Sequence, residues 1–228
     1  MGRTIFIGDI HGCYDELTQL LDKLRLQHDD RVVAVGDLTV KGPKSAEVLD
    51  LFANDSRFAS VAGNHDLALV RHWGDQSNPL NKAQAKAFHE LSTPDDRYFL
   101  YLASLPFFID LGSHVVVHAG FRPGIPLEKQ SSDDLVELRT LGADRTSREG
   151  DPWYEAYEGP ATVLFGHWPA PQPRLATYAI GLDTGCVYGG RLTAYVLESG
   201  EFVSVSAAET YDSSSSIPLT QSIKSVHN

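Results

Sequence analysis

Residues with carboxylate, imidazole and amide side chains recur in this sequence directly after short apolar runs. In the first case, Asp9 and His11 follow the run 4–7 and lie between two glycines, which allow a tight turn. Similar junctions supply the rest of the set, which is Asp37, Asn64, His65, His118 and His167. Such nitrogen and oxygen atoms are ligands for hard and borderline divalent cations. Two cations about 3.5–4 Å apart can clamp a phosphoryl group and activate water for in-line attack.

For any one of these histidines alone, a packed or surface position without a metal is the favoured interpretation. The joint occurrence of five such junctions in one chain favours a shared metal site instead. Because the set contains no cysteine, it fits a pair of cations such as Mn²⁺, Fe²⁺ or Zn²⁺ and does not fit a structural zinc site.

The elements that must position these residues alternate between strand and helix in the first third of the chain. The apolar runs at 4–7, 32–35 and 58–62 predict buried strands, and the segments 14–26 and 44–54 have helical spacing. Such alternation indicates parallel βαβ units, whose ligand sites lie at the carboxyl ends of the strands. The first three motifs fall at those ends.

The remainder of the chain predicts further strands and two helices. Helices over 82–91 and 95–105 are expected to form a cap or flank without chemistry of their own. A hairpin over 107–120 would deliver His118, and a strand over 161–169 would deliver His167. The last third is β-rich and predicts a second sheet packed on the first. We expect one domain over 1–206 and a mobile Ser-rich tail over 207–228.

Composition narrows the class of protein. The 228 residues are 42% hydrophobic, which suits one globular domain with a real core. No apolar run is long enough for a membrane span, and the sequence starts without a signal peptide. With only two cysteines, reduced thiols in the cytoplasm are expected. The net charge of −11 argues against a broad surface for nucleic acid or anionic lipid. No pattern specifies an oligomeric state.

The motifs GDIHG, GDLTVKGP, GNHD, HAG and GH, in this order, resemble the signature of the metallophosphoesterases of the phosphoprotein-phosphatase (PPP) superfamily. The resemblance implies an α/β fold, with a two-sheet β-sandwich flanked by helices, and two divalent ions. Mn²⁺ is expected first, with Zn²⁺, Fe²⁺ or Co²⁺ as alternatives. It also implies that His65 is the acid that protonates the leaving group, as an imidazole charged near neutral pH. The implied metal ligands are Asp9 and His11 on one ion, Asp37 bridging both, and Asn64, His118 and His167 on the other.

The motif GDLTVKGP departs from the pattern of the phosphoprotein phosphatases. It has Val40 and Lys41 at the two positions where those enzymes have Asp and Arg. Lys41 can bind phosphate as a point charge, whereas Val40 cannot orient His65. The changed motif, together with FGHWP and GLDTGCVYGGRLTAY, is similar instead to the branch of the symmetrical diadenosine tetraphosphatases and the ApaH-like phosphatases. That resemblance implies a phosphate-gripping role for Arg139, which we expect on a helix after Asp133 and Asp134, and it places Asn64 beside the substrate.

We therefore expect a dinuclear metal hydrolase with Asp37 and His65 at the centre of its chemistry. Its expected substrate is a small anionic dinucleoside polyphosphate, or else inorganic polyphosphate or a capped RNA end. The rivals are a small Ser/Thr or Tyr protein phosphatase and a non-catalytic metal-binding module. Four further side chains each allow two interpretations. Trp153 and Tyr154 could stack on a base or pack in the core, and Asp183 could support a metal-bound histidine or cap a turn. Lys44 could bind phosphate or be solvated at the surface.

Overall fold

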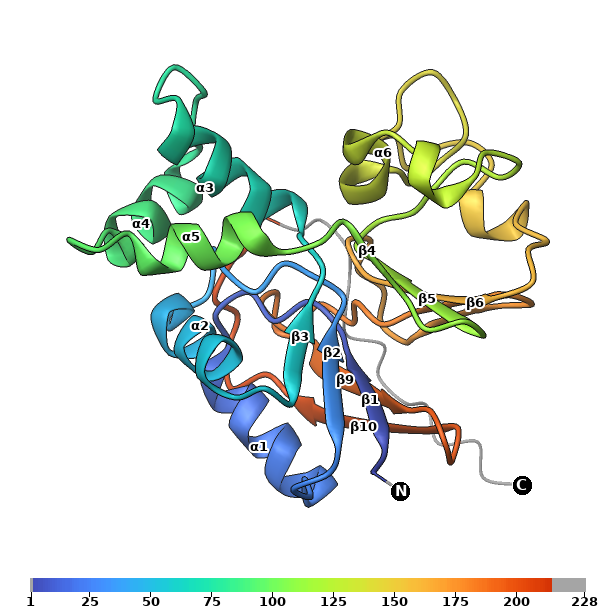
Figure 1. The fold of residues 1–228 in the computed structure, drawn as a ribbon, viewed down its shortest axis with the longest axis horizontal. Coiled ribbons are helices and arrows are strands. Elements are labelled where there is room, and N and C mark those ends of the chain that lie inside the picture. Colours follow the sequence, from blue (N-terminus) through green and yellow to red (C-terminus); the bar gives the residue numbers. More distant parts are fainter. Residues whose placement is uncertain (1, 215–228) are drawn as a thin grey trace.

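A computed structural model describes residues 2–214 and contains two five-stranded sheets flanked by helices (Figure 1). Residues from both sheets share one buried cluster, which includes Phe6 and Val33 from the first sheet and Val116 and Leu164 from the second. The sheets therefore pack on one another as a sandwich, which confirms the expected fold.

The first sheet combines the N-terminal strands with the last hairpin of the chain. Its strands, in spatial order, are β10 (Glu201–Ser206), β9 (Arg191–Val196), β1 (Thr4–Ile7), β2 (Arg31–Ala34) and β3 (Phe58–Ser60). The first three strands of the chain are parallel to one another, whereas β9 pairs antiparallel with β1. Along β1, Ile5 and Ile7 face one core cluster and Phe6 the other, as the period of a strand requires.

The second sheet is built from the middle of the chain. In spatial order it contains β4 (Phe108–Asp110), β5 (His114–Val117), β6 (Thr162–Phe165), β8 (Ala179–Gly181) and β7 (Arg174–Ala176). The central strands β5, β6 and β8 are parallel, and the two outer strands are antiparallel to their neighbours. The carboxyl ends of β5 and β6 therefore lie at one edge, immediately before His118 and His167.

Helices cover the first sheet and extend from it (Figure 1). Helix α1 buries Leu17, Leu20 and Leu24 in the largest core cluster, and α2 adds Val48 and Leu49 to it. The other helices form a group of three beside the first sheet and a short one beyond the second. The helix bounds are α1 (Tyr14–Leu24), α2 (Ser45–Asn54), α3 (Asn64–Gly74), α4 (Lys82–Leu91), α5 (Arg97–Ser104) and α6 (Ser132–Glu137), with single 3₁₀ turns at Leu127–Lys129 and Trp153–Glu155.

The structure corrects the expected chain organisation in two places. Helix α3 was not predicted, because its first turn coincides with the motif GNHD, which reads as a loop. The second sheet is confirmed, but the last hairpin, β9–β10, joins the first sheet instead. The short strand β7 is a further addition.

The segment expected to be a tail begins with residues that contact the domain. The backbone N–H of Ala207 donates to the Gly190 carbonyl, and those of Tyr211 and Asp212 donate to Val187. The rest of the expected tail, 215–228, lies outside the described residues. None of the helices within 2–214 is long and apolar enough to cross a membrane.

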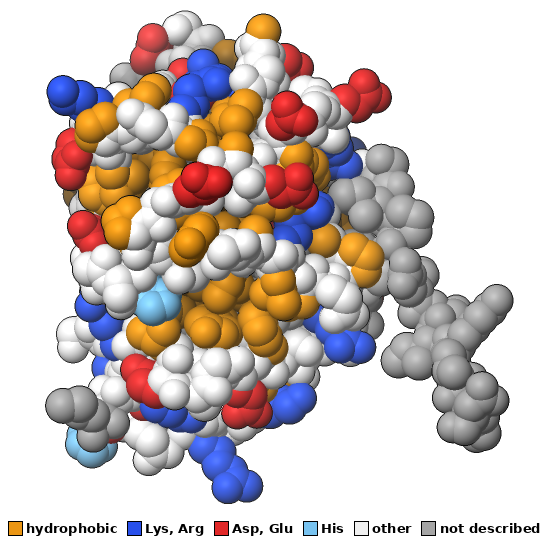
Figure 2. Space-filling model, turned by 90° about the vertical axis from the view of Figure 1, so that its right-hand side faces the viewer, with side chains coloured by type: hydrophobic (Ala, Val, Ile, Leu, Met, Phe, Trp, Pro, Cys, Tyr) orange, Lys and Arg blue, Asp and Glu red, His pale blue; other side chains and the backbone are white. Residues whose placement is uncertain are grey.

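One face of the molecule, on the right-hand side of Figure 1, is shown in Figure 2. Groups of hydrophobic side chains alternate there with acidic and basic ones, and the basic side chains are spread out rather than gathered. Among the described residues, the most exposed large hydrophobic side chains are Leu100, Ile125, Leu175, Tyr178 and Phe202.

Candidate active site

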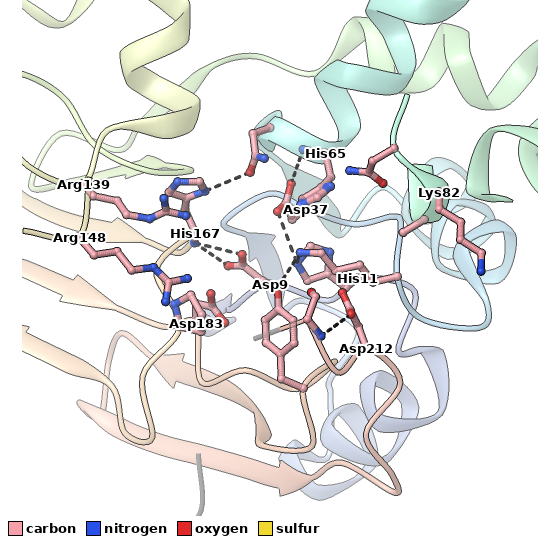
Figure 3. Close-up of a pocket in the computed structure, with 17 residues that line it drawn as sticks. Asp9, His11, Asp37, His65, Lys82, Arg139, Arg148, His167, Asp183 and Asp212 are labelled. Carbon is pink, nitrogen blue, oxygen red and sulfur yellow. Dashed lines mark hydrogen bonds and ion pairs between the residues drawn. The ribbon is translucent and has the colours of Figure 1, made fainter. Parts of the chain in front are cut away.

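The strand-end residues meet in one pocket of about 440 Å³ where the two sheets present their carboxyl ends (Figure 3). Most of the predicted residues line this pocket, and His118 lies behind them, fully buried. The members that line it directly are Asp9, His11, Asp37, Lys41, Asn64, His65, Arg139 and His167.

Asp37 is the residue that the whole cluster shares. Its Oδ2 lies 3.5 Å from Nε2 of His11 and 3.5 Å from Nε2 of His118. Two groups of potential ligands, each with its atoms within 4.8 Å of one another, both contain Asp37. One group adds His11 and His65, and the other adds Asp9 and His118. A carboxylate shared by two adjoining ligand groups suits a position between two cations.

Two of the histidines are oriented by backbone carbonyls. Nδ1 of His118 lies 2.9 Å from the carbonyl oxygen of Val35, and Nδ1 of His11 lies 3.1 Å from that of Thr39. In a neutral ring whose Nδ1 donates to a carbonyl, the other nitrogen, Nε2, has a free lone pair. Both Nε2 atoms face Asp37, so these rings present ligand atoms to the centre of the cluster.

Asn64 begins α3 and faces two imidazoles. Its Oδ1 lies 3.1 Å from Nε2 of His118 and 3.0 Å from Nδ1 of His167. An amide oxygen only accepts hydrogen bonds, so without an ion either ring can donate a proton to it. When these ring nitrogens are unprotonated, the oxygen and both nitrogens can face one cation. The arrangement is therefore compatible with a cation-binding place between Asn64, His118 and His167.

Asp9 is tied to the loop that carries His167. Its two carboxylate oxygens accept the backbone N–H of His167 at 3.2 and 3.0 Å. The preceding residue must be Gly166, because a Cβ atom there would collide with Oδ1 of Asp9. This close approach couples the end of β1 to the end of β6.

Backbone strain is concentrated at this place. Seven described non-glycine residues have a positive φ, and five of them belong to the two loops of the motifs or to the loop after β6. They are His11 (50°), Asp37 (49°), Val40 (72°), Lys41 (73°) and His167 (65°). Such conformations persist only where surrounding contacts impose them, and they gather at functional sites.

The electrostatics of the cluster fit divalent cations. Burial, reinforced by Asp183, raises the pKa of Asp9 well above its ordinary value, and burial also raises the pKa of Asp183 to about 6. For His118 burial acts in the opposite direction, but the carboxylate of Asp37 outweighs it and raises the pKa to about 9. A proton on His118 thus compensates buried negative charge that a cation would otherwise balance. The donor set and its charge therefore fit the metal ions that the resemblance implies.

His65 lies beside this cluster on the first turn of α3. Its backbone N–H donates to Oδ1 of Asp37 at 2.9 Å, and its ring is 5.2 Å from that of His11. Burial lowers the pKa of His65 to about 4, with Lys41 contributing. Without bound ions, the pKa of His65 is thus lower than that of the imidazole charged near neutral pH that the resemblance implies.

The side chain that contacts His65 comes from α4, a helix from which no chemistry was expected. Nε2 of Gln84 lies 3.5 Å from Nδ1 of His65, and Oε1 of Gln84 accepts the backbone N–H of Asn81 at 3.0 Å. The second bond fixes which end of the amide is which, so Gln84 donates to His65. This contact can orient the ring, but it offers a donor where the Asp of the phosphoprotein phosphatases would offer an acceptor.

Positive charges surround the cluster (Figure 3). Nζ of Lys41 lies 2.8 Å from the Tyr188 hydroxyl and 3.3 Å from Nε2 of His11. Arg139 and Arg148 point toward the cluster from one side of the pocket, whereas Lys82 lines the opposite side with its ammonium group directed away from the cluster. Arg139 does not lie on a helix as expected, since α6 ends two residues earlier, at Glu137. No periodic pattern in the sequence indicates a place in the pocket for Arg148 or Lys82.

Asp66 supports the loop that carries Asp37. This buried carboxylate accepts the backbone N–H groups of Leu38 and Thr39, each at 3.1 Å, and the Thr39 hydroxyl at 2.7 Å. The motif GNHD therefore contributes a supporting residue in addition to Asn64 and His65. Gly63, the first residue of this motif, lies so close to Asp37 that a Cβ atom on residue 63 would collide with Oδ1 of Asp37.

The structure decides between the two interpretations of Trp153, Tyr154 and Asp183. Trp153 is fully buried and donates from Nε1 to the Ala119 carbonyl at 3.0 Å, so it packs and does not stack on a base. Tyr154 packs against Phe165. Asp183 lines the pocket while it accepts the Gly185 N–H at 3.0 Å, which is the turn-capping role.

Lys44 is placed outside the pocket. It pairs with Asp15 at the surface, at 2.7 Å, and it contacts none of the residues of the metal cluster. Of its two interpretations, the solvated one is therefore correct.

The fold and this pocket define a hydrolase that acts on phosphate esters or anhydrides and whose ligand groups suit divalent metal ions. The sequence profile of the calcineurin-like phosphoesterases matches residues 2–204, and the chain belongs to that family.

Relatives and solved structures agree with this assignment. The chain is 35% identical to the asymmetrical bis(5'-nucleosyl)-tetraphosphatase PrpE of Bacillus velezensis, over 91% of this chain and 94% of the relative. It is 30% identical to the symmetrical bis(5'-nucleosyl)-tetraphosphatase of Neisseria meningitidis, over 90% and 96%. A crystal structure assigned as a candidate diadenosine tetraphosphatase is 36% identical, with a TM-score of 0.79 over 90% of this chain and 94% of that one. A protein-tyrosine phosphatase of Shewanella, 16% identical with a TM-score of 0.56 over 90% and 80%, shares the fold alone.

Proposed function

We propose that this protein hydrolyses a phosphoanhydride bond of dinucleoside tetraphosphates, with diadenosine tetraphosphate as the representative substrate. The observation that carries the proposal is the convergence of an oxygen and nitrogen ligand cluster and four cationic side chains on one pocket. The four are Lys41, Lys82, Arg139 and Arg148. A chain of phosphates needs positive charge on both sides of the bond that breaks, and this pocket supplies it.

In this proposal Asp9 and His11 would hold one ion, Asp37 would be shared, and Asn64, His118 and His167 would hold the other. In the structure the ligand atom of Asp9 groups with that of His118 rather than with that of His11, so this division of ligands rests on the resemblance. When bound, two such ions polarise the phosphate oxygens and lower the pKa of water. Mn²⁺ is the first candidate, because carboxylate and amide oxygens with imidazole nitrogens suit it, while Zn²⁺, Fe²⁺ and Co²⁺ accept the same donors.

The remaining roles belong to side chains that face the reacting phosphate. In this role His65 gives a proton to the leaving oxygen as an imidazolium and returns to the neutral ring. In the neutral ring, with Nδ1 accepting from Gln84, the proton on Nε2 can still hydrogen-bond to that oxygen. Lys41 and Arg139 bind the non-bridging oxygens, and Arg139 offers a fork that Lys41 lacks. Burial, with Arg148 nearby, lowers the pKa of Arg139.

We further propose that cleavage is asymmetrical, giving a nucleoside triphosphate and a nucleoside monophosphate. The cations are distributed unevenly, with two arginines on one side of the ligand cluster and Lys82 on the other (Figure 3). An uneven distribution favours three phosphates on one side of the broken bond and one on the other. The relative from Bacillus velezensis bears the word asymmetrical in its name, which supports the same outcome.

A substrate panel tests the proposal. The full chain is assayed with Mn²⁺, Co²⁺ or Zn²⁺ on diadenosine tetraphosphate, inorganic polyphosphate, 5′-capped RNA and a phosphopeptide, and the products are separated by chromatography. We expect the highest kcat/KM on diadenosine tetraphosphate, with ATP and AMP as products. Two molecules of ADP would refute the asymmetrical cleavage alone. Preference for the phosphopeptide would instead favour the protein-phosphatase alternative.

A further inference from the structure

Two thiols and a carboxylate meet in the core at a place that the proposed reaction does not use. The sulfur atoms of Cys13 and Cys186 and a carboxylate oxygen of Glu16 lie within 4.8 Å of one another. All three residues are buried, with exposed fractions of 0%, 1% and 1%. We propose that this cluster is a metal site of a second kind, which binds one thiophilic divalent cation, Zn²⁺ in the first instance.

The carboxylate of Glu16 is held on one side only. Its Oε1 accepts the backbone N–H of Ala208 at 2.9 Å and the hydroxyl of Tyr211 at 2.8 Å. Its Oε2 is buried and has no hydrogen-bond partner among the described residues. A buried carboxylate oxygen without a partner has lost its hydration and gained no hydrogen bond in return, which is unfavourable. A cation between Oε2 and the sulfurs removes that cost, and the bonds to Oε1 orient the carboxylate as supporting contacts orient metal ligands.

The two thiols contact each other: a hydrogen bond with Cys13, together with burial, raises the pKa of the Cys186 thiol, so a cation must displace this proton. Both cysteines are unpaired as disulfides, and the Cys13 sulfur lies a long 4.0 Å from the His11 carbonyl oxygen. Burial of cysteine as a small apolar residue explains the position of the sulfurs, but it does not explain why an unpartnered carboxylate accompanies them. A shared cation explains both features.

The donor set selects a different cation from the one in the pocket. Two thiolates with one carboxylate suit Zn²⁺, whereas the pocket offers only nitrogen and oxygen. Zn–S bonds of about 2.3 Å in a tetrahedron place two sulfurs about 3.8 Å apart, so the two sulfurs need to approach each other by at most about 1 Å. Each thiol releases its proton to solvent when it coordinates.

The position of the cluster gives the ion a structural role. Cys13 directly precedes α1, and Cys186 lies in the loop between β8 and β9, three residues after Asp183. Tyr211, through Glu16, adds the segment after β10. One ion would thus join the N-terminal motif to two segments near the other end of the described chain, behind Asp183 and Tyr188, which line the pocket.

Cobalt spectroscopy tests this site without any measurement of activity. The full chain is reduced with a phosphine, stripped of metal with a chelator, freed of both, and titrated anaerobically with Co²⁺. Two free thiols per unfolded chain are confirmed first with a thiol reagent. Thiolate bound to Co²⁺ produces a charge-transfer band in the near ultraviolet, which the oxygen and nitrogen ligands of the pocket do not produce. We expect one band that saturates and that one equivalent of added Zn²⁺ abolishes.

Variants separate the two sites. Cys186→Ser should remove most of this band, while Asp37→Asn, which alters the pocket cluster, should leave it intact. Absence of the band in the reduced wild-type chain at excess Co²⁺ overturns the proposal, and so does a band of full intensity in Cys186→Ser. Zn²⁺ competition in the wild-type chain needs no variant, so the test stands even where a substitution prevents folding.

Discussion

The amide of Gln84 donates toward Nδ1 of His65 across 3.5 Å, and it joins two helices that the sequence did not connect. Gln84 also closes the capping box of α4 with Asn81, so its side chain is fixed from the other end. A residue with two such bonds can hold an imidazole in one orientation. We therefore regard Gln84 as a positioning residue for His65.

Replacing this amide should affect turnover more than substrate binding. Gln84→Ala should lower kcat on diadenosine tetraphosphate about fivefold, the equivalent of a hydrogen bond worth ~1 kcal/mol, with KM changed less. Steady-state kinetics across pH measure both quantities. Gln84→Glu is the matched control, because it retains the capping box and offers a carboxylate to His65. A nearby carboxylate raises the pKa of an imidazole, so the basic limb of the rate profile should move to higher pH. Equal kcat in the wild type and the alanine variant would exclude the positioning role.

The space beside Asp37 admits no side chain at residue 63. Gly63→Ala places a Cβ against Oδ1 of Asp37, which must then move away from the cluster. We expect activity to fall by about 10–100-fold, as for other residues that orient a metal ligand. Gly74 ends the same helix, and a Cβ there would meet nothing within 4 Å, so Gly74→Ala should keep full activity and gain up to ~1 kcal/mol of stability. Activity assays with thermal melts compare the pair, and equal activity of both variants would contradict the steric account.

We expect Arg148 to strengthen the binding of substrates with several linked phosphates and not the binding of phosphate monoesters. It lines the pocket, whereas Arg145, three residues earlier, is engaged with Asp134 at 3.1 Å. Arg148→Ala should raise KM for diadenosine tetraphosphate about tenfold, the equivalent of roughly 1.4 kcal/mol, and change KM for p-nitrophenyl phosphate little. Arg145→Ala is the matched control for removing a charge from the same segment. If both variants raise KM on the tetraphosphate equally, Arg148 has no specific place beside the phosphates.

Many residues of this site could be predicted from the sequence because they directly follow strands. A run such as 4–7 fixes a strand, and parallel strands bring their carboxyl ends together, so Asp9 and Asp37 could be placed beside one another. The contact between Gln84 and His65 could not be predicted, since it depends on how two helices cross. Arg148 stands in an irregular loop, where no periodicity indicates the direction of a side chain.

The pairing of the strands and the positions of the helices could be predicted less well than the motifs. The hairpin β9–β10 has the alternation of any strand pair, and nothing local states that β9 adds to β1 rather than to β8. Helix α3 was missed because Gly63, Asn64 and Asp66 are typical of turns, although they also begin helices well. In both cases long-range packing decided between conformations that the local sequence permits.

Far from the pocket, the buried carboxylate of Asp30 pairs with Arg3. This pair makes the free energy of unfolding depend on pH. The side-chain bond from Arg3, 2.6 Å from Oδ2, lowers the pKa of Asp30 to about 2, below the value of about 3.9 in unfolded chains. Its contribution is therefore complete above about pH 4 and is lost as the pH falls through 2. Asp30→Asn should lower the free energy of unfolding at pH 7 by about 1–2 kcal/mol, with a smaller difference at pH 2.5. Urea denaturation at several pH values measures this.

The surface pair of Asp55 and Arg57 is the control for that experiment. Their atoms are also 2.6 Å apart, but both side chains are about three-tenths exposed. Asp55→Asn should therefore cost less than about 1 kcal/mol at pH 7. A difference between Asp30→Asn and the wild type that stayed the same from pH 7 to pH 2.5 would show that packing, and not charge, is what Asp30 contributes.

The role of Asp37 as the shared ligand is tested most directly by one comparison. Hydrolysis of diadenosine tetraphosphate with Mn²⁺ is followed by chromatography for the wild type and for Asp37→Asn, whose fold is checked by circular dichroism. The account predicts ATP and AMP from the wild type and at least about a thousandfold slower turnover in the variant, the loss of ~4 kcal/mol in the transition state. Equal turnover by the two folded proteins would contradict it.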